Sequence, residues 1–593
     1  MNLKLISVAA AIGAILFGAA SCIKIDSELG GNFIPTDQLW DVFPCEPVAL
    51  EDITMKQSVN LSGYSTTRFA FGSVKDDNFT CTKGTSFTLV PLSDSLDFGD
   101  ISIDNIQNIQ FHLAAVRDTV SVLYDSQLRM LQNVYVYSLT EPLDSNILYT
   151  GDRDKIKVDL SRTITEGIPV YNGGDSLSFN FSSEYARAVM KGIEKWQSEY
   201  GEDRADSLSY YLKHVPGVYM ETAEQTVNGG RINMFDLSIS ASDGYINGNY
   251  AELKIRSEYD GKLTDTSFLF YFGPSEFLKE SSTSYPTQYA FNTSTNSAGE
   301  SFFEDWNNGA KDKLYVEGGS GYKPVVSAKE IKRLVNDLIA EKKAEGYNIN
   351  EEEVVINKAT IILPYNIGAD YEKLERYPMI LSPTVRIPVS DGDQEYISYA
   401  GLTDSSIESE NQGNINRSLS LYSPDVSHHI QEIVKLKRGE GKNVESDESP
   451  EDYQKRVDKY DIWFLILHEE ITESSSSNSS YNDYYNNLLY NSYYNNMMYD
   501  PYGYGYGYGG YGYGGYGYGS YGGYGYNNYY NYLMMAQYAS AANSSTTQTS
   551  SSIELDKDRF YSAVLNGPGA GGEDVMQKPR LKITFSAPMK AEE

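Results

Sequence analysis

The sequence is poor in the residues that most often carry metal or nucleophilic chemistry. It has five histidines, four tryptophans and three cysteines among 593 residues. It also lacks a Gly-Lys-Ser/Thr phosphate-binding loop and a Gly-x-Ser-x-Gly nucleophile elbow. Residues 505–510 match the Gly-x-Gly-x-x-Gly dinucleotide fingerprint, but they follow no predicted strand and open no predicted helix. We therefore expect no enzyme activity, no cofactor and no metal.

The few histidines do not form a metal-binding pattern. His468 and Glu469 begin like the helix of a zinc protease, but the fourth position onward is Thr472 and the segment is typical of a strand. His428 and His429 are adjacent, so a helix would point them to different sides. We interpret this pair as polar residues on a helix surface.

Positive charge is also in short supply. The chain has 48 Lys and Arg against 81 Asp and Glu, which gives a formal net charge of −33. Such a chain repels phosphate backbones, so nucleic-acid binding is disfavoured. The acidic run at residues 391–395 lacks the spacing of a calcium loop, and we interpret it as a solvated turn. A hydrolase that uses some pair of the many carboxylates is the weakest of the alternatives, because sequence cannot place two carboxylates across a cleft.

Long apolar runs are absent except at the start of the chain. Lys4 precedes an apolar stretch at residues 5–20, which is short for a membrane span, and the small residues at 19–21 lead directly into Cys22. This is the pattern of a lipoprotein signal peptide over residues 1–21, with Cys22 as the lipidation site. An ordinary signal peptide whose cleavage site contains a cysteine is the alternative. The acyl chains would anchor the mature chain to a membrane without embedding it.

The two remaining cysteines, Cys45 and Cys81, would lie in an oxidising compartment. A disulfide between them is one expectation, and it would stabilise the fold by about 3–4 kcal/mol in the chain-entropy model. Two buried free thiols are the other. Two cysteines alone make a poor metal site.

Most of the mature chain reads as short strands separated by Gly, Asn, Asp and Ser. Period-2 alternation at residues 106–113, 134–137 and 251–255 is typical of half-buried antiparallel strands. Two helices interrupt this pattern. One covers residues 184–200, and the other covers residues 328–345, with Ser327 and Glu330 expected as a capping box and Gly346 as its stop.

Similar segments recur in the same order in both halves of the chain. Each half has an opening strand, a segment that leads into a helix, an apolar strand and a closing strand, which is residues 251–256 in one half and 579–584 in the other. The predicted fold is mostly β, with two tandem jelly-roll-like antiparallel β-sandwiches and a few helices. The predicted division is a signal peptide (1–21), an N-terminal tether (22–44), a first sandwich unit (45–325), a connector helix (326–346) and a second sandwich unit (347–593).

Residues 473–552 differ in composition from the rest of the chain. Within residues 501–526, 11 of 26 are Tyr and 13 are Gly. Glycine has a high conformational entropy, and the tract has little aliphatic surface to bury. We expect a disordered Tyr/Gly/Asn/Ser-rich insertion in the second sandwich unit. Its tyrosines would either stack on sugars, peptides or one another, or have no specific role.

Aromatic side chains are the most serious indication of glycan binding. Trp306 lies in a turn-like Glu-Asp-Trp-Asn-Asn-Gly stretch, where it would be exposed. Trp463 lies in a segment that is apolar on both faces, so we expect it in the core.

Three features of the sequence occur together: Cys22 with its following leader, residues 65–72 running into 85–90, and an ending from residues 564–567 through 579–585. In these features the chain resembles the Bacteroidetes outer-membrane lipoproteins of domain-of-unknown-function family 4270. The resemblance implies an outer-membrane lipoprotein without established catalytic residues, so it identifies no site.

Two functions from different classes follow as expectations. The first is a non-catalytic accessory subunit of an outer-membrane protein complex that serves barrel assembly, secretion or uptake. The second is a cell-surface glycan-binding lipoprotein. Both place the protein at the outer membrane through its N-terminal acyl chains, with the cell surface expected and the periplasmic face as the alternative. The first also needs an outer-membrane protein partner.

Overall fold

A computed structural model of the chain describes most residues between 40 and 588. The described residues are 40–58, 68–92, 96–143, 153–200, 207–237, 239–242, 245–273, 290–299, 301–347, 349–367, 374, 377–391, 394–404, 413–441, 444–474, 548–555 and 560–588. This part of the chain is mostly β, with several antiparallel sheets in a sandwich-like arrangement and a few helices. The predicted fold class is confirmed at this level, and the jelly-roll topology stays a prediction.

The first unit, residues 68–298, holds one hydrophobic core between two groups of strands. Its main strands are β4 (Arg68–Lys75), β5 (Phe79–Pro91), β6 (Asn108–Val122), β7 (Gln132–Leu139), β9 (Val170–Tyr171), β10 (Ser176–Phe181), β11 (Val218–Thr222), β12 (Gly229–Asp236), β15 (Tyr250–Tyr259), β16 (Lys262–Gly273) and β17 (Phe291–Ala298). Helices α2 (Ser183–Tyr200) and α3 (Ser207–His214) belong to the same unit. The long strands β5 and β6 each pair with strands of both groups. Because β5 also pairs with β16, six strands close into a ring in the order β16, β15, β6, β12, β4 and β5.

The second unit holds a separate core between two sheets. One sheet contains β1 (Trp40–Pro44), β2 (Val48–Ala49), β28 (Arg580–Pro588), β20 (Val355–Pro364), β24 (Leu421–Tyr422) and β23 (Ile415–Asn416). The other contains β22 (Gln394–Gly401), β21 (Ile380–Asp391), β25 (Ile462–Ser474), β19 (Tyr322–Val326), β3 (Ile53–Gln57) and β26 (Gln548–Leu555). A β18 (Lys313–Glu317) and β27 (Ser562–Asn566) pair and helices α4 (Phe302–Asn308), α5 (Ala328–Ala344), α7 (Ser427–Lys435) and α8 (Pro450–Asp458) complete this unit.

The strand pairings of the two units are equivalent where the sequence suggested a repeat. In the first unit β6 pairs with β10 on one side and β15 on the other, and α2 follows β10 and packs on β6. In the second unit β20 pairs with β24 and β28, and α7 follows β24 and packs on β20. The opposite layers also correspond, because β11 pairs with β5 and β7 as β25 pairs with β19 and β21. The repeat is therefore a repeat of strand order and partners.

The two cores divide the chain at other residues than the sequence predicted. Strands β1–β3, expected in the tether and the first unit, pair with β28 and β19 and fill the second core. Strands β18 and β19 also belong to the second core, and so does α5, which packs against α7 and α8. The predicted boundaries at 45, 325 and 346 therefore do not separate the two cores. The pairing partners of these strands lie hundreds of residues away, so the sequence around each strand does not indicate which core it joins.

The two predicted helices are confirmed. On α2, the predicted apolar face (Ala186, Val189, Met190, Ile193 and Trp196) is buried in the first core. On α5, Gly346 follows the helix with φ of +102°, as predicted, and the apolar face is buried in the second core. This face consists of Ile331, Leu334, Val335, Leu338 and Ile339. The capping box was wrong, because Ser327 makes no side-chain cap bond. The Glu330 carboxylate instead accepts hydrogen bonds from the backbone N–H groups of Glu51 and Asp52, at 2.7 and 2.9 Å, and so ties the early strands to α5.

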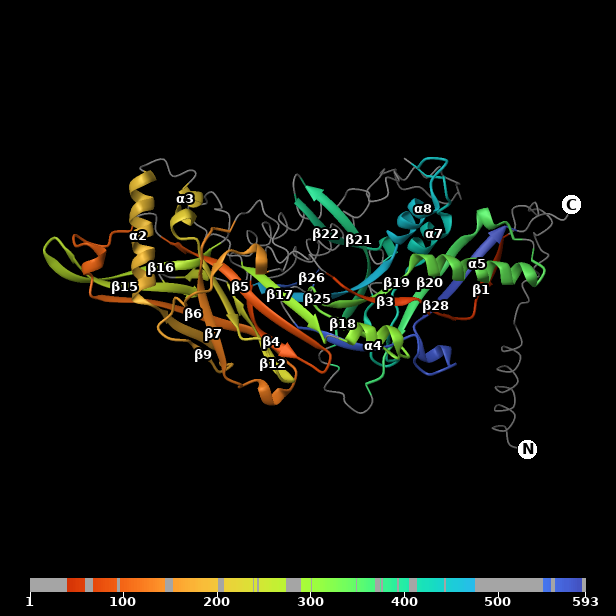
Figure 1. Cartoon of the computed structure of the whole chain (residues 1–593), viewed down its shortest axis with the longest axis horizontal. Helices are drawn as coiled ribbons and strands as arrows, with labels where there is room; N and C mark the ends of the chain where they lie inside the picture. Colours follow the sequence, from red (N-terminus) through yellow and green to blue (C-terminus); the bar gives the residue numbers. More distant parts are fainter. Residues whose placement is uncertain are drawn as a thin grey trace, which may run out of the picture.

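The two units contact each other where β5 and β17 meet the turn between β18 and β19. Phe79 of β5 packs into the second core, with its ring centroid 4.7 Å from that of Phe302. The turn contributes Ser320, whose hydroxyl donates to the Ser294 carbonyl of β17 at 2.9 Å. Beneath this turn Glu317 and Lys323 are both buried, and burial raises the pKa of the Glu317 carboxyl. Figure 1 shows the result as a body elongated along one axis, with the β15–β16 hairpin at one end and β1 and β28 at the other.

The Tyr/Gly-rich insertion begins and ends on neighbouring strands. β25 and β26 pair antiparallel, with Ser474 opposite Gln548. The predicted insertion at 473–552 is therefore shortened by a few residues at each end, because the strands extend into it. Residues 475–547 lie outside the described residues. In the part of the chain that the structure describes, no helix is long and apolar enough to cross a membrane.

Candidate functional site

The predicted cysteine sites have two different outcomes. Cys22 lies outside the described residues, so its lipidation stays a prediction. Cys45 and Cys81 are both buried, and neither takes part in a disulfide. Cys45 belongs to the core of the second unit, whereas Cys81 lies on β5 in a small cluster with Val74 and Phe560. The expected disulfide is thus not formed, and the alternative of two buried thiols is what the fold contains.

This arrangement predicts low thiol reactivity in the folded protein. In a Cys22→Ser chain, dithionitrobenzoate should label almost no thiol under native conditions and two after denaturation in guanidinium. The reason is that Cys45 and Cys81 are 9% and 3% exposed and burial raises the pKa of the Cys45 thiol, which disfavours the reactive thiolate. A reducing agent should leave the melting temperature unchanged. If the denatured chain reacted with dithionitrobenzoate only after reduction, Cys45 and Cys81 would be joined in a disulfide, which contradicts the structure.

The two tryptophans considered for glycan binding, Trp306 and Trp463, are both buried and do not form an aromatic binding platform. Trp306 was expected to be exposed, but it lies on α4, is 8% exposed and donates from Nε1 to the Lys313 carbonyl at 2.7 Å. The short helix turns the ring inward, which the turn-like composition around it did not indicate. Trp463 is buried as predicted, on the face of β25 that carries Leu465, while Phe464 faces the main core.

The adjacent histidines also differ from their sequence interpretation. His429 is buried on α7 rather than exposed on its surface. Its Nε2 is 2.9 Å from the Tyr460 carbonyl, and burial lowers its pKa to about 4. A buried neutral imidazole with a backbone partner is a structural histidine. Among the described residues, no group of three or more His, Cys, Asp or Glu side chains is arranged to hold a metal ion.

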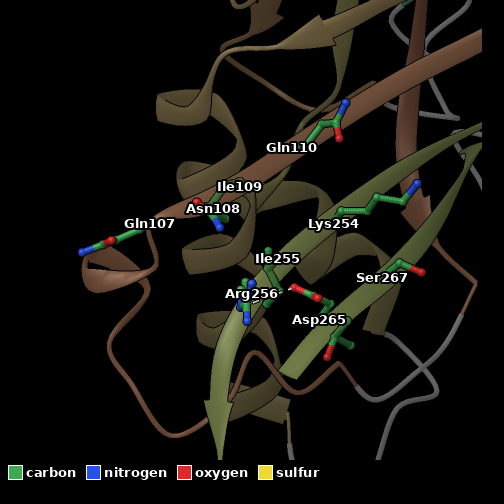
Figure 2. A pocket seen from close by; sticks show the side chains of 10 residues that line it. Gln107, Asn108, Ile109, Gln110, Lys254, Ile255, Arg256, Asp265 and Ser267 are labelled. Atoms are coloured by element: carbon green, nitrogen blue, oxygen red, sulfur yellow. Dashed lines mark ion pairs between the residues drawn. The ribbon is translucent and has the colours of Figure 1, made fainter. Parts of the chain in front are cut away.

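An open hollow of about 620 Å³ lies on the outer face of β6, β15 and β16 (Figure 2). The strand register builds it from two polar rows. Gln110, Lys254 and Ser267 stand opposite one another in the first row. Asn108, Arg256 and Asp265 form the second. Between the rows, Ile255 is 2% exposed and points into the core, so the period of two places the side chains of the two polar rows outside.

The hollow is suited to binding polar groups. Arg256 Nε lies 3.8 Å from Asp265 Oδ1, but both side chains are at least half exposed, so this pair contributes little to stability. Lys254 Nζ lies 2.8 Å from Glu252 Oε2, and this hydrogen bond raises the pKa of Lys254. The lining therefore offers two cations, amides and hydroxyls but one carboxylate and no histidine or cysteine. These groups can donate hydrogen bonds to a carboxylate or an amide of a docked partner.

The sequence contained part of the signal for this hollow. The alternation in residues 251–256 identified a strand with Lys254 and Arg256 on its outer face. It did not indicate which strands lie beside β15. Comparisons with protein-family models, with curated proteins and with solved structures found no match.

Proposed function

We propose that the protein is a non-catalytic, lipid-anchored accessory subunit of an outer-membrane protein complex, and that it docks a protein partner on the hollow. The observation that carries the proposal is the position of the hollow. It lies on the first unit, whereas β1, the strand that follows the expected tether, is at the opposite end of the elongated body (Figure 1).

The contacts between the units support a scaffold role. Phe79 and Ser294 join the first unit to α4 and to the β18–β19 turn, and Gln57 adds a hydrogen bond to the Asn296 carbonyl at 3.1 Å. A body joined by packing and by hydrogen bonds would hold the hollow at a fixed distance from β1, the strand that follows the expected tether. The resemblance to family 4270 lipoproteins agrees with this proposal, which places the anchor in the outer membrane, expected at the cell surface.

The charge of the hollow suggests how a partner is selected. Lys254 and Arg256 are exposed cations on a chain whose formal net charge is −33. A partner with acidic and amide side chains would be attracted to this face and repelled by most others, which favours one docking orientation. Sugar hydroxyls could also bond to these groups. However, the hollow has no aromatic lining on which a sugar ring could stack, so the glycan-binding function becomes the second outcome of the test.

The test is affinity purification of the C-terminally tagged chain from membranes solubilised in mild detergent. We expect a membrane protein to co-purify in stoichiometric amount with the wild type. The double variant Lys254→Glu and Arg256→Glu should reduce its recovery at least about tenfold, since two cations facing a complementary partner become like charges.

The matched control is the double variant Arg162→Glu and Lys191→Glu. Both side chains are exposed, lie on the first unit and are outside the hollow. This control should recover the partner as the wild type does. Equal loss in both variants would contradict docking on the hollow. A wild-type chain that purifies alone but binds a glycan array would replace the accessory-subunit function with the glycan-binding one.

A further inference from the structure

Three arginine side chains converge on one turn of the first unit, away from the hollow. The turn is residues 172–175, Asn-Gly-Gly-Asp, between β9 and β10. Arg117 comes from β6, Arg129 follows the short helix η4 (Asp125–Gln127), and Arg231 comes from β12. Nη1 of Arg117 and Nη1 of Arg129 both donate to the Gly173 carbonyl, at 2.7 and 2.9 Å. We call Arg117, Arg129 and Arg231 the arginine cluster.

Arg231 is the structural member of the cluster. It is fully buried, and its Nε donates to Asn233 Oδ1 at 2.7 Å while its Nη1 donates to the Leu128 carbonyl at 2.6 Å. Its guanidinium lies over the Tyr171 ring, 5.2 Å from the centroid. Burial, with smaller contributions from the charges of Arg117 and Arg129, lowers the pKa of Arg231 to about 10. The side chain stays protonated at neutral pH and adds a fixed charge beneath the turn.

Arg117 and Arg129 are the accessible members. Arg129 is exposed and Arg117 is 23% exposed. Each guanidinium carries five N–H donors, and the shared Gly173 carbonyl takes one from each. The nearby carboxylate is that of Asp175, which is 3.5 Å from Arg117 and 91% exposed. An ion pair this exposed is weak, so solvent or a ligand can displace the Asp175 carboxylate from Arg117.

The balance of charge around the turn favours an added anion. Three guanidinium groups lie around the turn, and the carboxylate of Asp175 pairs with one of them, Arg117, on a chain that is otherwise strongly acidic. Like charges held close together in a partly buried site raise its energy, and an anion between them lowers it. Two adjacent guanidinium forks also match the spacing of oxygens in a carboxylate or a sulfate.

We propose that the arginine cluster is a binding site for an oxyanionic group, a carboxylate or sulfate, which displaces Asp175 and bridges Arg117 and Arg129. The group can be a free anion or a substituent of an acidic polysaccharide. This proposal is independent of docking on the hollow, because the two sites share no residue.

Isothermal titration calorimetry of the full chain tests it, with sodium sulfate as the probe and sodium chloride holding the ionic strength constant. We expect saturable binding by the wild type. Arg129→Gln should weaken it about tenfold, the factor expected for loss of one charge-assisted hydrogen bond. Asp175→Asn should strengthen it, because the competing carboxylate is removed. The control Arg162→Gln changes an exposed arginine of the same unit that pairs with Glu184, and it should bind as the wild type does.

The Asp175→Asn variant separates a binding site from a purely structural cluster. If the arginines only hold the turn, removing Asp175 leaves sulfate binding absent or weaker, and that result overturns the proposal. Equal sulfate affinity in Arg129→Gln and Arg162→Gln also overturns it. A second titration with polygalacturonate identifies the source of the anion. Tighter binding per carboxylate than for free sulfate assigns the site to an acidic polymer, and weaker binding assigns it to a small anion.

Discussion

Ile53→Ala should destabilise the second unit by about 2–5 kcal/mol and leave the first unit unchanged. This result is expected even though Ile53 precedes the whole first unit in the sequence. The side chain is completely buried in the second core, and β3 pairs with β19, where Ile53 stands opposite Val326. Removing three buried carbon atoms there leaves a cavity between sheet strands that the rigid surroundings fill poorly.

The measurement is native-state hydrogen exchange followed by mass spectrometry, which reports stability segment by segment. Ile53→Ala should speed exchange in β19, β25 and β28 and spare β6 and β15. Ile255→Ala is the matched control, because Ile255 is 2% exposed in the first core. The Ile255→Ala variant should speed exchange in β6 and β15 and leave exchange in β19, β25 and β28 unchanged. Faster exchange in β6 and β15 of the Ile53→Ala chain would show that β3 supports the first unit after all.

His429 should make the protein sensitive to mild acid. Its pKa is lowered to about 4 in the folded state by burial, against about 6.5 in an unfolded chain. Between these values the unfolded chain binds more protons, so the free energy of unfolding falls as the pH falls. The stabilisation that comes from keeping His429 neutral is fully present above about pH 6.5. About 3 kcal/mol of this free energy of unfolding is lost by pH 4.

Urea unfolding at pH 7 and at pH 4 measures this loss. His429→Gln should lose about 3 kcal/mol less than the wild type between the two pH values, since glutamine does not titrate. His428→Gln is the control, because His428 is the neighbouring residue on α7 and is only partly buried. It should keep most of the acid sensitivity. A wild type and a His429→Gln variant with the same pH dependence would mean that folding does not lower the pKa of the His429 imidazole.

Local patterns in the sequence predicted the individual strands and helices well. They predicted poorly which distant residues each of these elements contacts. The alternation at residues 251–255 became β15, and the apolar stripe at residues 184–200 became α2, because both signals depend only on which face is buried. The repeated order of segments also anticipated the equivalent pairings of β6 and β20. For β15 and α2 the information lies within a few residues, whereas the repeat appears only when the two halves of the chain are compared.

The errors share a different cause. Glu330 was expected to cap its own helix, but it accepts hydrogen bonds from Glu51 and Asp52, which are 279 and 278 residues away. Trp306 and His429 were expected at the surface, and each is buried with a backbone carbonyl as partner. Only the tertiary fold brings such partners together. The hollow depends in the same way on the register of three strands, so sequence could supply its residues but not its shape.

Photo-crosslinking in living cells tests the proposed function most directly. A benzoylphenylalanine residue placed at Gln110 would lie in the hollow, and one placed at Lys191 would be exposed on the same unit outside it. We expect a discrete adduct with one membrane protein from position 110 and none from position 191. The same adduct from both positions, or no protein adduct from position 110, would contradict docking of a protein partner on this face.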